Sequence, residues 1–195
     1  MHRQLFSIAV LFGASALGGA RADRLPEPVP VGSRLGHRLC EAFVNGPDAG
    51  KQRSLICALA GRPAVLIYAR EIDPSLLDLI KKLDAVAQRG NEQQMKSSCV
   101  LLTTRDEDRE RLQALAQREK PRATFLATTP YQEGGPYFAA SAGRCYLHKE
   151  ATVTVIVLQR LTVQSSYAFR KGQLNDGNVK EIVKAASALL PAAKK

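Results

Sequence analysis

The sequence predicts an α/β domain in which a central mixed sheet carries helices on both faces. Two apolar runs, 64–69 and 99–102, are typical of strands buried on both sides of a parallel sheet. Each is followed by a segment with helical spacing of apolar residues. Two further strand-like runs, 152–158 and 163–169, are separated by a few residues and predict an antiparallel hairpin. The order β-α-β-α-(β)-β-β-α therefore joins a parallel unit to a hairpin and a last helix.

The first elements follow from local signals along the chain. A strand is expected near 39–44, with a glycine-rich turn over 45–50. After the first buried run, Asp73 is a natural N-cap and Pro74 suits the first helical position. Gly90 is the expected stop of this helix.

The middle of the chain repeats the pattern and then becomes irregular. A mixed-charge helix follows the second buried run, with Leu112 and Leu115 facing inward, and ends before Pro121. Residues 123–127 predict a short third strand. The glycine-rich segment 129–145 predicts an irregular insertion before the hairpin.

The last element is a helix that begins at Asn175 or Asp176, since either side chain serves as an N-cap. Its apolar residues follow three-four spacing, which predicts one buried face. They are Val179, Ile182, Val183, Ala186, Leu189 and Leu190.

The first 22 residues have the three parts of a cleavable secretory signal. Arg3 gives a positive start, residues 5–12 form an apolar core, and residues 20–22 read A-x-A before Asp23. The apolar run is too short to span a bilayer, and no cysteine stands near the cleavage point for lipid attachment. We therefore expect an exported protein, periplasmic or secreted.

Cleavage leaves 173 residues, enough for one domain with its own core. Residues 23–36 contain three prolines and two glycines and predict an extended lead-in, and residues 37–192 are the expected folded domain. No second apolar segment approaches membrane-spanning length, so we expect no membrane span.

The chain is basic, but its charges are dispersed. Removing residues 1–22, which carry Arg3 and Arg21, lowers the net charge from +10 to +8. The stretch 105–111 interleaves both signs, which is typical of a solvated helix face. Aromatic residues are few and no nucleic-acid motif occurs, so nucleic acid is not an expected partner. An envelope scaffold held to anionic surfaces by charge is a weaker alternative.

The predicted order of elements is that of the thioredoxin fold in its redoxin variant, and the chain resembles a group of exported bacterial thioredoxin-like proteins. The resemblance covers roughly residues 40–190 and rests on the order and spacing of short segments. These are VNGP at 44–47, GRPAVLIYAR at 61–70, LIKKLD at 79–84, VLLT at 100–103, ATVTV at 151–155 and YAFRKGQL at 167–174.

Members of that group often carry a C-x-x-C pair just before the Arg-Pro and its buried strand. The resemblance places Cys57 at the second cysteine and Ser54 at the first, so this chain has a degenerate S-x-x-C site. A dithiol can attack a substrate disulfide and then resolve the mixed disulfide internally, whereas a single thiol needs a second thiol from elsewhere.

Two further features of the family are missing. Redoxin peroxidases place the reactive cysteine in the loop or first helical turn after the first core strand. Here that region, residues 70–76, contains none, so peroxidase activity is not expected. Arg70, Glu71 and Asp73 stand at a strand end where open α/β sheets place ligands, but an ion pair and a helix cap explain them. The proline that precedes the hairpin in working thioredoxins is absent as well.

The four cysteines permit two disulfides in an oxidising compartment, in any of three connectivities. Cys57 has three open interpretations: a lone nucleophile beside Ser54, a structural disulfide partner of Cys40, and an inert, partly buried thiol. Cys99 lies inside an apolar strand and is expected in the core, and Cys145 falls in the insertion. No histidine or cysteine spacing fits a metal, and no cofactor is expected.

The leading hypothesis is an exported thioredoxin-fold binding or accessory module, whose partner is another exported protein. The alternative is an enzyme of cell redox homeostasis, a thiol-disulfide oxidoreductase that acts through Cys57 with another cysteine as resolver.

Overall fold

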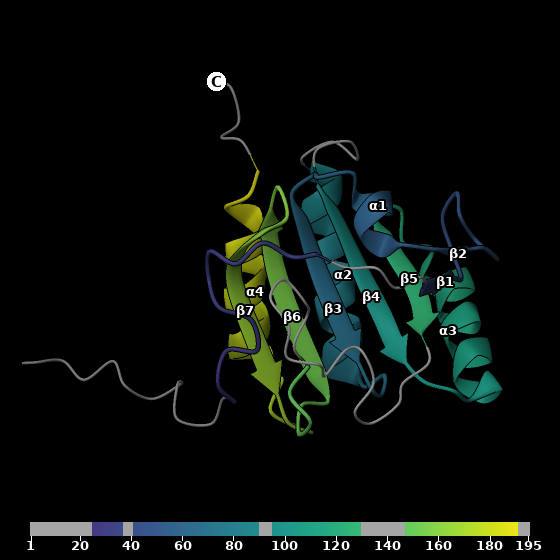
Figure 1. Cartoon of the computed structure of the whole chain (residues 1–195). Helices are drawn as coiled ribbons and strands as arrows, with labels where there is room; N and C mark the ends of the chain where they lie inside the picture. The colour runs from purple at the N-terminus through teal and green to yellow at the C-terminus, as the bar shows by residue number, and fades with distance from the viewer. Residues whose placement is uncertain (1–24, 37–40, 90–94, 130–146, 191–195) are drawn as a thin grey trace, which may run out of the picture.

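The computed structural model describes residues 25–36, 41–89, 95–129 and 147–190. A seven-stranded mixed sheet, in the order β2-β1-β5-β4-β3-β6-β7, forms its centre (Figure 1). The predicted α/β class is therefore confirmed. The strands are β1 (Glu41–Phe43), β2 (Gln52–Arg53), β3 (Ala64–Ala69), β4 (Lys96–Leu102), β5 (Thr124–Thr129), β6 (Val153–Gln159) and β7 (Thr162–Phe169).

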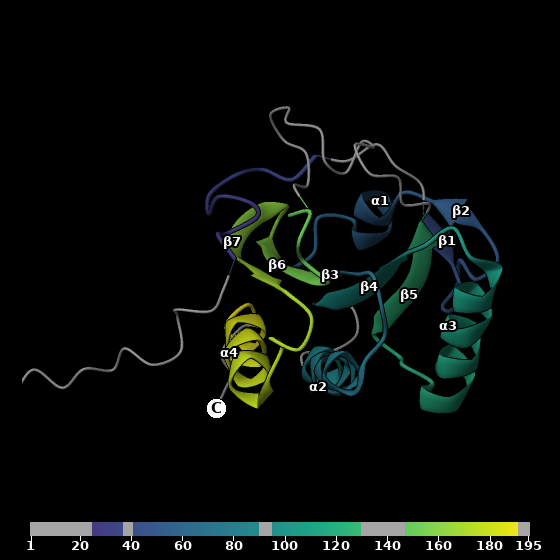
Figure 2. The same cartoon turned by 90° about the horizontal axis from the view of Figure 1, so that it is seen from below.

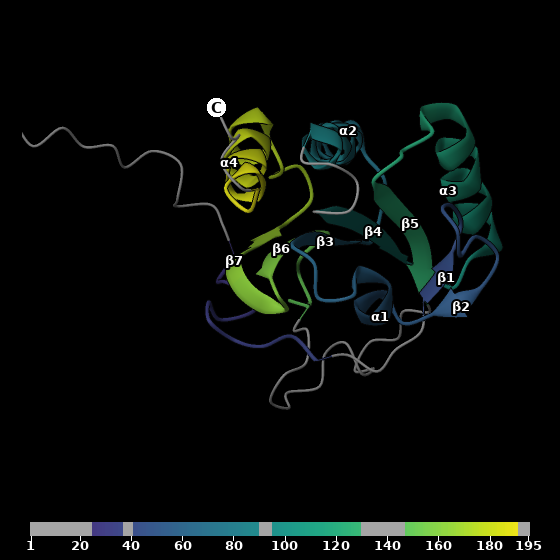
Figure 3. The ribbon, with the colours of Figure 1, turned by 90° about the horizontal axis from the view of Figure 1, so that it is seen from above.

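Helices cover both faces of the sheet, but unequally. The helices are α1 (Leu55–Leu59), α2 (Pro74–Arg89), α3 (Asp106–Glu119) and α4 (Asp176–Ser187). The three long helices α2, α3 and α4 lie along one face, whereas α1 lies on the other (Figure 2). Figure 3 shows the same layers from the opposite side, with the N-terminal segment (purple) running past β7 on the face of the sheet that carries α1.

Three successive strands of the chain, β3, β4 and β5, lie side by side in the sheet and run parallel. Ile67 of β3 pairs with Cys99 of β4, which in turn pairs with Leu126 of β5. On the other side of β3, Ile67 pairs with Val155 of the antiparallel hairpin formed by β6 and β7. The parallel unit, the short extra strand and the hairpin match the sequence prediction.

The alternation of side chains along β3 divides the interior into two cores. Val65 and Ile67 face the three long helices, and Leu66 and Tyr68 face α1 and the N-terminal segment. All six residues of β3 are buried, because both faces are covered.

Residues 25–36 form part of the second core. Val29 and Leu35 are 2 % exposed and pack in the same cluster as Leu55 and Leu59 of α1. The Leu35 N–H donates to the Leu161 carbonyl at 2.7 Å, which ties the segment to the hairpin. In the part of the chain described, no helix is both long and apolar enough to cross a bilayer.

The caps predicted for two helices are present. Asp73 Oδ1 accepts a hydrogen bond from the Leu76 N–H at 2.7 Å, and Asn175 Oδ1 accepts one from the Asn178 N–H at 3.0 Å. The chain also contains α1 and β2, which we did not predict. A five-residue helix and a two-residue strand are too short to leave a periodic pattern.

Candidate functional site

The S-x-x-C segment lies at the start of α1. Ser54 is the N-cap residue, and Cys57 is the third residue of the helix. Cys57 is exposed and forms no disulfide with another residue that the structure describes. The N-cap and third positions are where a C-x-x-C pair would place both sulfurs at a helix N-terminus, whose dipole stabilises a thiolate.

A carboxylate already occupies that helix terminus. Glu41 Oε2 accepts a hydrogen bond from the Leu55 N–H at 2.9 Å, and Glu41 is fully buried. Ser54 makes no capping hydrogen bond through its side chain. The cap of α1 is thus supplied from β1, fourteen residues earlier in the chain. A carboxylate at this place competes with a thiolate for the same donors and repels it.

The end of β3 lies far from Cys57. The five-residue α1 precedes β3, and Asp73 follows it, so the length of a six-residue strand, about 20 Å, separates the two positions. In Figure 1, α1 lies beside the starts of β3 and β4, and the arrowheads of both strands lie at the opposite end. Asp73 caps α2, and Glu71 forms an ion pair with Lys171 at 2.9 Å. The cap agrees with the prediction, and the ion pair of Glu71 is made with Lys171, a partner that the sequence did not indicate.

Of the other three cysteines, the structure describes only Cys99. Cys99 is fully buried in β4, as predicted, and burial raises the pKa of its thiol to about 12. Cys40 and Cys145 lie outside the described residues, so the Cys40–Cys57 disulfide stays a prediction. Among the residues that the structure describes, no cluster of three or more histidine, cysteine or acidic side chains could hold a metal.

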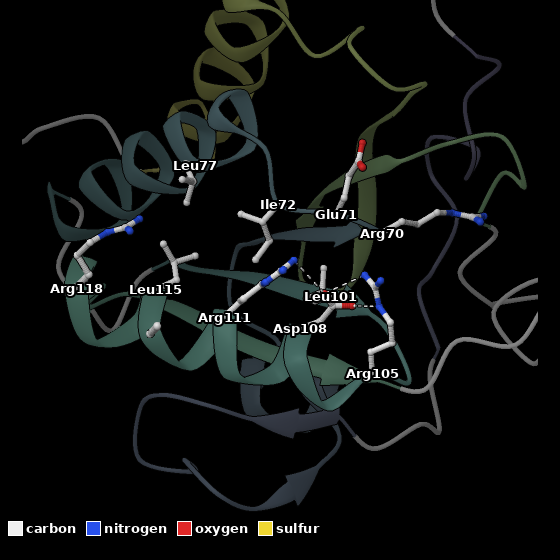
Figure 4. Close-up of a pocket in the computed structure, with 11 residues that line it drawn as sticks. Arg70, Glu71, Ile72, Leu77, Leu101, Arg105, Asp108, Arg111, Leu115 and Arg118 are labelled. Atoms are coloured by element: carbon white, nitrogen blue, oxygen red, sulfur yellow. Dashed lines mark hydrogen bonds and ion pairs between the residues drawn. The ribbon is translucent and has the colours of Figure 1, made fainter.

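A cavity of about 510 Å³ opens between α2 and α3 at the ends of β3 and β4 (Figure 4). Its apolar surface includes Leu77 of α2, Leu101 of β4 and Leu115 of α3. A smaller cavity of about 100 Å³ continues along the same two helices and shares Leu77 and Leu115 with it. We call the two cavities together the α2–α3 groove.

Basic side chains outnumber acidic ones around the larger cavity. Its described lining contains four arginines and two acids, namely Arg70, Arg105, Arg111, Arg118, Glu71 and Asp108. In Figure 4, Arg111 points into the middle of the groove, and Arg118 lies at the end beside Leu77. The side chain of Arg70 points away from the others.

Asp108 is held firmly within this lining. Thr103 Oγ1 and Arg105 Nε each donate to Asp108 Oδ2 at 2.7 Å, and Arg105 Nη2 donates to Oδ1 at 3.0 Å. The hydrogen bond from Thr103, followed by those from Arg105, lowers the pKa of the Asp108 carboxyl. Arg111 approaches Oδ1 only to 3.9 Å, beyond hydrogen-bonding distance.

We interpreted the charges over 105–111 as a solvated helix face, and so did not predict this groove. The available signal was the spacing of Arg111, Leu115 and Arg118, which places all three on one side of a helix. A leucine between two arginines does not by itself show whether that face of the helix borders a groove or faces bulk solvent.

Neither a protein-family model nor a curated protein sequence matches this chain. Solved structures do resemble it. A thiol:disulfide interchange protein from Bacteroides sp. is 10 % identical, with a TM-score of 0.55 over 86 % of this chain and 95 % of the other. The yeast mitochondrial 1-Cys peroxiredoxin is 9 % identical, with a TM-score of 0.57 over 83 % of this chain and 76 % of the other.

A third similar structure is the thioredoxin domain of a thiol-disulfide oxidoreductase from Bacteroides vulgatus. It is 12 % identical, with a TM-score of 0.52 over 80 % of this chain and 99 % of the other. At such identities the likeness establishes the fold alone. The chain has the thioredoxin-like fold, in agreement with the resemblance drawn from its sequence.

Proposed function

We propose that this protein is an exported, thioredoxin-fold binding module that does not use dithiol chemistry. The observation that carries the proposal is the Glu41 cap on α1. The helix terminus that would stabilise a thiolate at Cys57 instead receives a carboxylate, at 2.9 Å from the Leu55 N–H.

The strand end used by redoxin peroxidases supports the same proposal. The turn after β3 holds Asp73, which caps α2, and residues 70–76 contain no cysteine. The described thiols are Cys57, on the other side of the sheet, and Cys99, buried in the core. The turn after β3, where redoxin enzymes place their reactive cysteine, lies beside the α2–α3 groove in this protein. A groove of this kind is suited to ligand binding.

Reduction of insulin by dithiothreitol, followed by turbidity, tests this proposal. We expect the purified protein to add nothing to the uncatalysed rate, whereas a thioredoxin control accelerates it. Catalysis that is lost in Cys57→Ala would refute the proposal. Replacing the buried Cys99 by alanine is a matched thiol deletion that should leave the assay unchanged.

The alternative, a thiol-disulfide oxidoreductase that acts through Cys57, has one observation in its favour. Cys57 is exposed on α1, and Glu41, the residue after Cys40, contacts the first turn of that helix. Mass spectrometry after alkylation under non-reducing conditions tests whether Cys40 serves as resolver. A Cys40–Cys57 disulfide that opens and closes with the redox buffer would favour the enzyme.

Ser54→Cys restores a C-x-x-C pair at the N-cap and third positions of α1. We expect a reversible disulfide between positions 54 and 57, because the motif closes a short loop at a helix N-terminus. The variant should gain weak insulin reductase activity, limited by the Glu41 carboxylate. Thiol counts in defined redox buffers measure the pairing. If the two positions never pair at any potential, the placement of Ser54 at the first cysteine is wrong.

A further inference from the structure

The α2–α3 groove has an apolar floor and a basic rim, which together define a class of ligand. Leu101 rises from β4 beneath the cavity, and Leu77 and Leu115 flank it from the two helices. Its volume of about 510 Å³ falls in the range of small-molecule sites in proteins. Leu101 is 2 % and Leu115 5 % exposed. The apolar surface still open to a ligand therefore belongs to Ile72, Leu77 and Ala114.

The acidic groups in the groove are already satisfied, so its arginines dominate. Asp108 receives three hydrogen bonds from Thr103 and Arg105, and Glu71 pairs with Lys171. The guanidinium of Arg111 points into the groove in Figure 4 and stands 3.9 Å from Asp108. Within the described residues, Arg111 therefore keeps hydrogen-bond donors for an incoming anion.

The second arginine lies two helical turns further along α3. Arg118 is seven residues after Arg111, which puts both on the side of α3 that carries Leu115. Arg118 also pairs with Glu119 on its own helix at 2.8 Å, so its charge is partly offset. Arg111 is thus the better anchor, and Arg118 adds a weaker attraction at the far end.

Building on the proposed binding function, we propose that the α2–α3 groove binds an amphipathic organic acid. The carboxylate hydrogen-bonds to the guanidinium of Arg111, and the apolar body covers the accessible parts of Ile72, Leu77 and Ala114. A carboxylate matches the planar donors of arginine, and binding removes the accessible apolar surface of Ile72, Leu77 and Ala114 from water. Binding is non-covalent and involves no thiol.

A chemical-shift titration of the ¹⁵N-labelled protein tests this proposal with three probes. Octanoate has both the charge and the apolar body, 1-octanol has the body alone, and acetate has the charge alone. We expect saturable shifts at residues of α2, α3 and the end of β4 with octanoate. Octanol should bind at least about tenfold more weakly, since one charge-assisted hydrogen bond is worth roughly that factor. Acetate should bind at least about tenfold more weakly as well, because it keeps that hydrogen bond but lacks the apolar chain, and each buried CH₂ is worth about 0.8 kcal/mol.

Substitutions on α3 locate the anion. Arg111→Gln should weaken octanoate binding about tenfold, and Arg118→Gln about threefold. Arg109→Gln is the matched control, because Arg109 is an exposed arginine of the same helix outside this lining, and it should change the affinity less than twofold. Equal losses in all three variants would show attraction by net charge alone and would overturn the proposal.

A blocking variant tests the apolar part independently. Ala114 lines the groove from an exposed position on α3, so Ala114→Trp fills it without disturbing the core. Octanoate binding should be lost in Ala114→Trp and kept in the neighbouring control Gln113→Trp. Equal binding of octanoate and octanol, or shifts confined to other regions, would also refute the proposal. These outcomes are separate from the insulin assay, which tests the absence of dithiol chemistry whether or not octanoate binds.

Discussion

Helix α2 packs closely against α4, whereas an open, charged groove separates it from α3. Leu83 and Val86 of α2 share one buried cluster with Val179 and Ile182 of α4, and the same cluster includes Leu112 and Leu115 of α3. The fully or nearly fully buried apolar residues of α3 are only Leu112 and Leu115. The two helix pairs lie on the same face of one sheet (Figure 2). The difference shows that the sheet positions the helices, and that their own apolar residues decide whether the space between them closes.

At the groove an ion pair joins the two helices, and α3 contributes two buried leucines, Leu112 and Leu115, to the shared core. Lys81 of α2 pairs with Glu119 of α3 at 2.9 Å, at the end where the smaller cavity lies. Ion pairs of exposed side chains add little stability. The α2–α3 side should therefore tolerate substitutions that the α2–α4 side does not, and the following predictions test that contrast.

The largest effect is expected at the closed interface. Ile182→Ala removes a fully buried side chain of α4 and should lower the free energy of unfolding by about 3 kcal/mol, through lost burial and a residual cavity. Leu77→Ala, on the groove side of α2, should cost about 1 kcal/mol, because its side chain is only partly buried. Urea denaturation measures both. Equal costs would contradict the contrast.

A smaller effect is expected at Asp84, which anchors the groove side of α2 to the chain before β5. Its Oδ1 accepts the Ala123 N–H at 2.8 Å, and its Oδ2 accepts the Arg122 N–H at 3.3 Å. Asp84→Ala leaves the buried Ala123 N–H without this partner and should cost about 2 kcal/mol. Asp84→Asn keeps one acceptor oxygen and should cost about half as much. The melting temperatures of the two variants distinguish these costs. If Asp84→Ala melted at the same temperature as the parent protein, Asp84 would not anchor α2.

The smallest effect concerns Asp108 in the groove and depends on pH. The hydrogen bonds from Thr103 and Arg105 lower the pKa of its carboxyl in the folded protein. The stabilisation is therefore present above the unfolded pKa of about 3.9 and is lost as pH falls through the folded pKa. Asp108→Asn should cost about 1 kcal/mol at pH 7, since the arginine partner is solvated.

Urea midpoints measured from pH 7 down to pH 2 test the Asp108 prediction. The urea midpoint of the parent protein exceeds that of Asp108→Asn at pH 7, and this difference in midpoint should shrink as the pH falls below about 3.9. A difference that stays constant over this range would show that the charge of Asp108 contributes nothing.

The parts of the fold that the sequence predicts are those with long patterns or strong end signals. The apolar β3, the cap at Asp73 and the three-four spacing of α4 up to Ala186 each depend on local chemistry, and each is present in the structure. Leu189 and Leu190, which we assigned to the same helix, lie beyond its end at Ser187. The helix α1 is different, because its cap comes from Glu41 on β1. That contact forms only when the strands pair, so no local sequence pattern predicts it.

The candidate site was predictable only in part for a related reason. The order of segments placed Ser54 and Cys57 together, and the structure puts them at the N-cap and third positions of one helix. The groove could not be predicted, because Arg111 on α3 and Leu77 on α2 become neighbours only when the sheet sets the spacing of the helices.

The hydrogen bonds between the N-terminal segment and β7 have a consequence for self-association. β7 is an edge strand of the sheet, and an unpaired edge is a template for strands of other molecules. Gly32 donates to the Val163 carbonyl, and the Val163 N–H donates in turn to Ser33, so part of that edge is already occupied. The prolines at 26, 28 and 30 cannot donate a backbone hydrogen bond to a further strand. The segment thus leaves less of this edge open to pairing with a strand of another molecule.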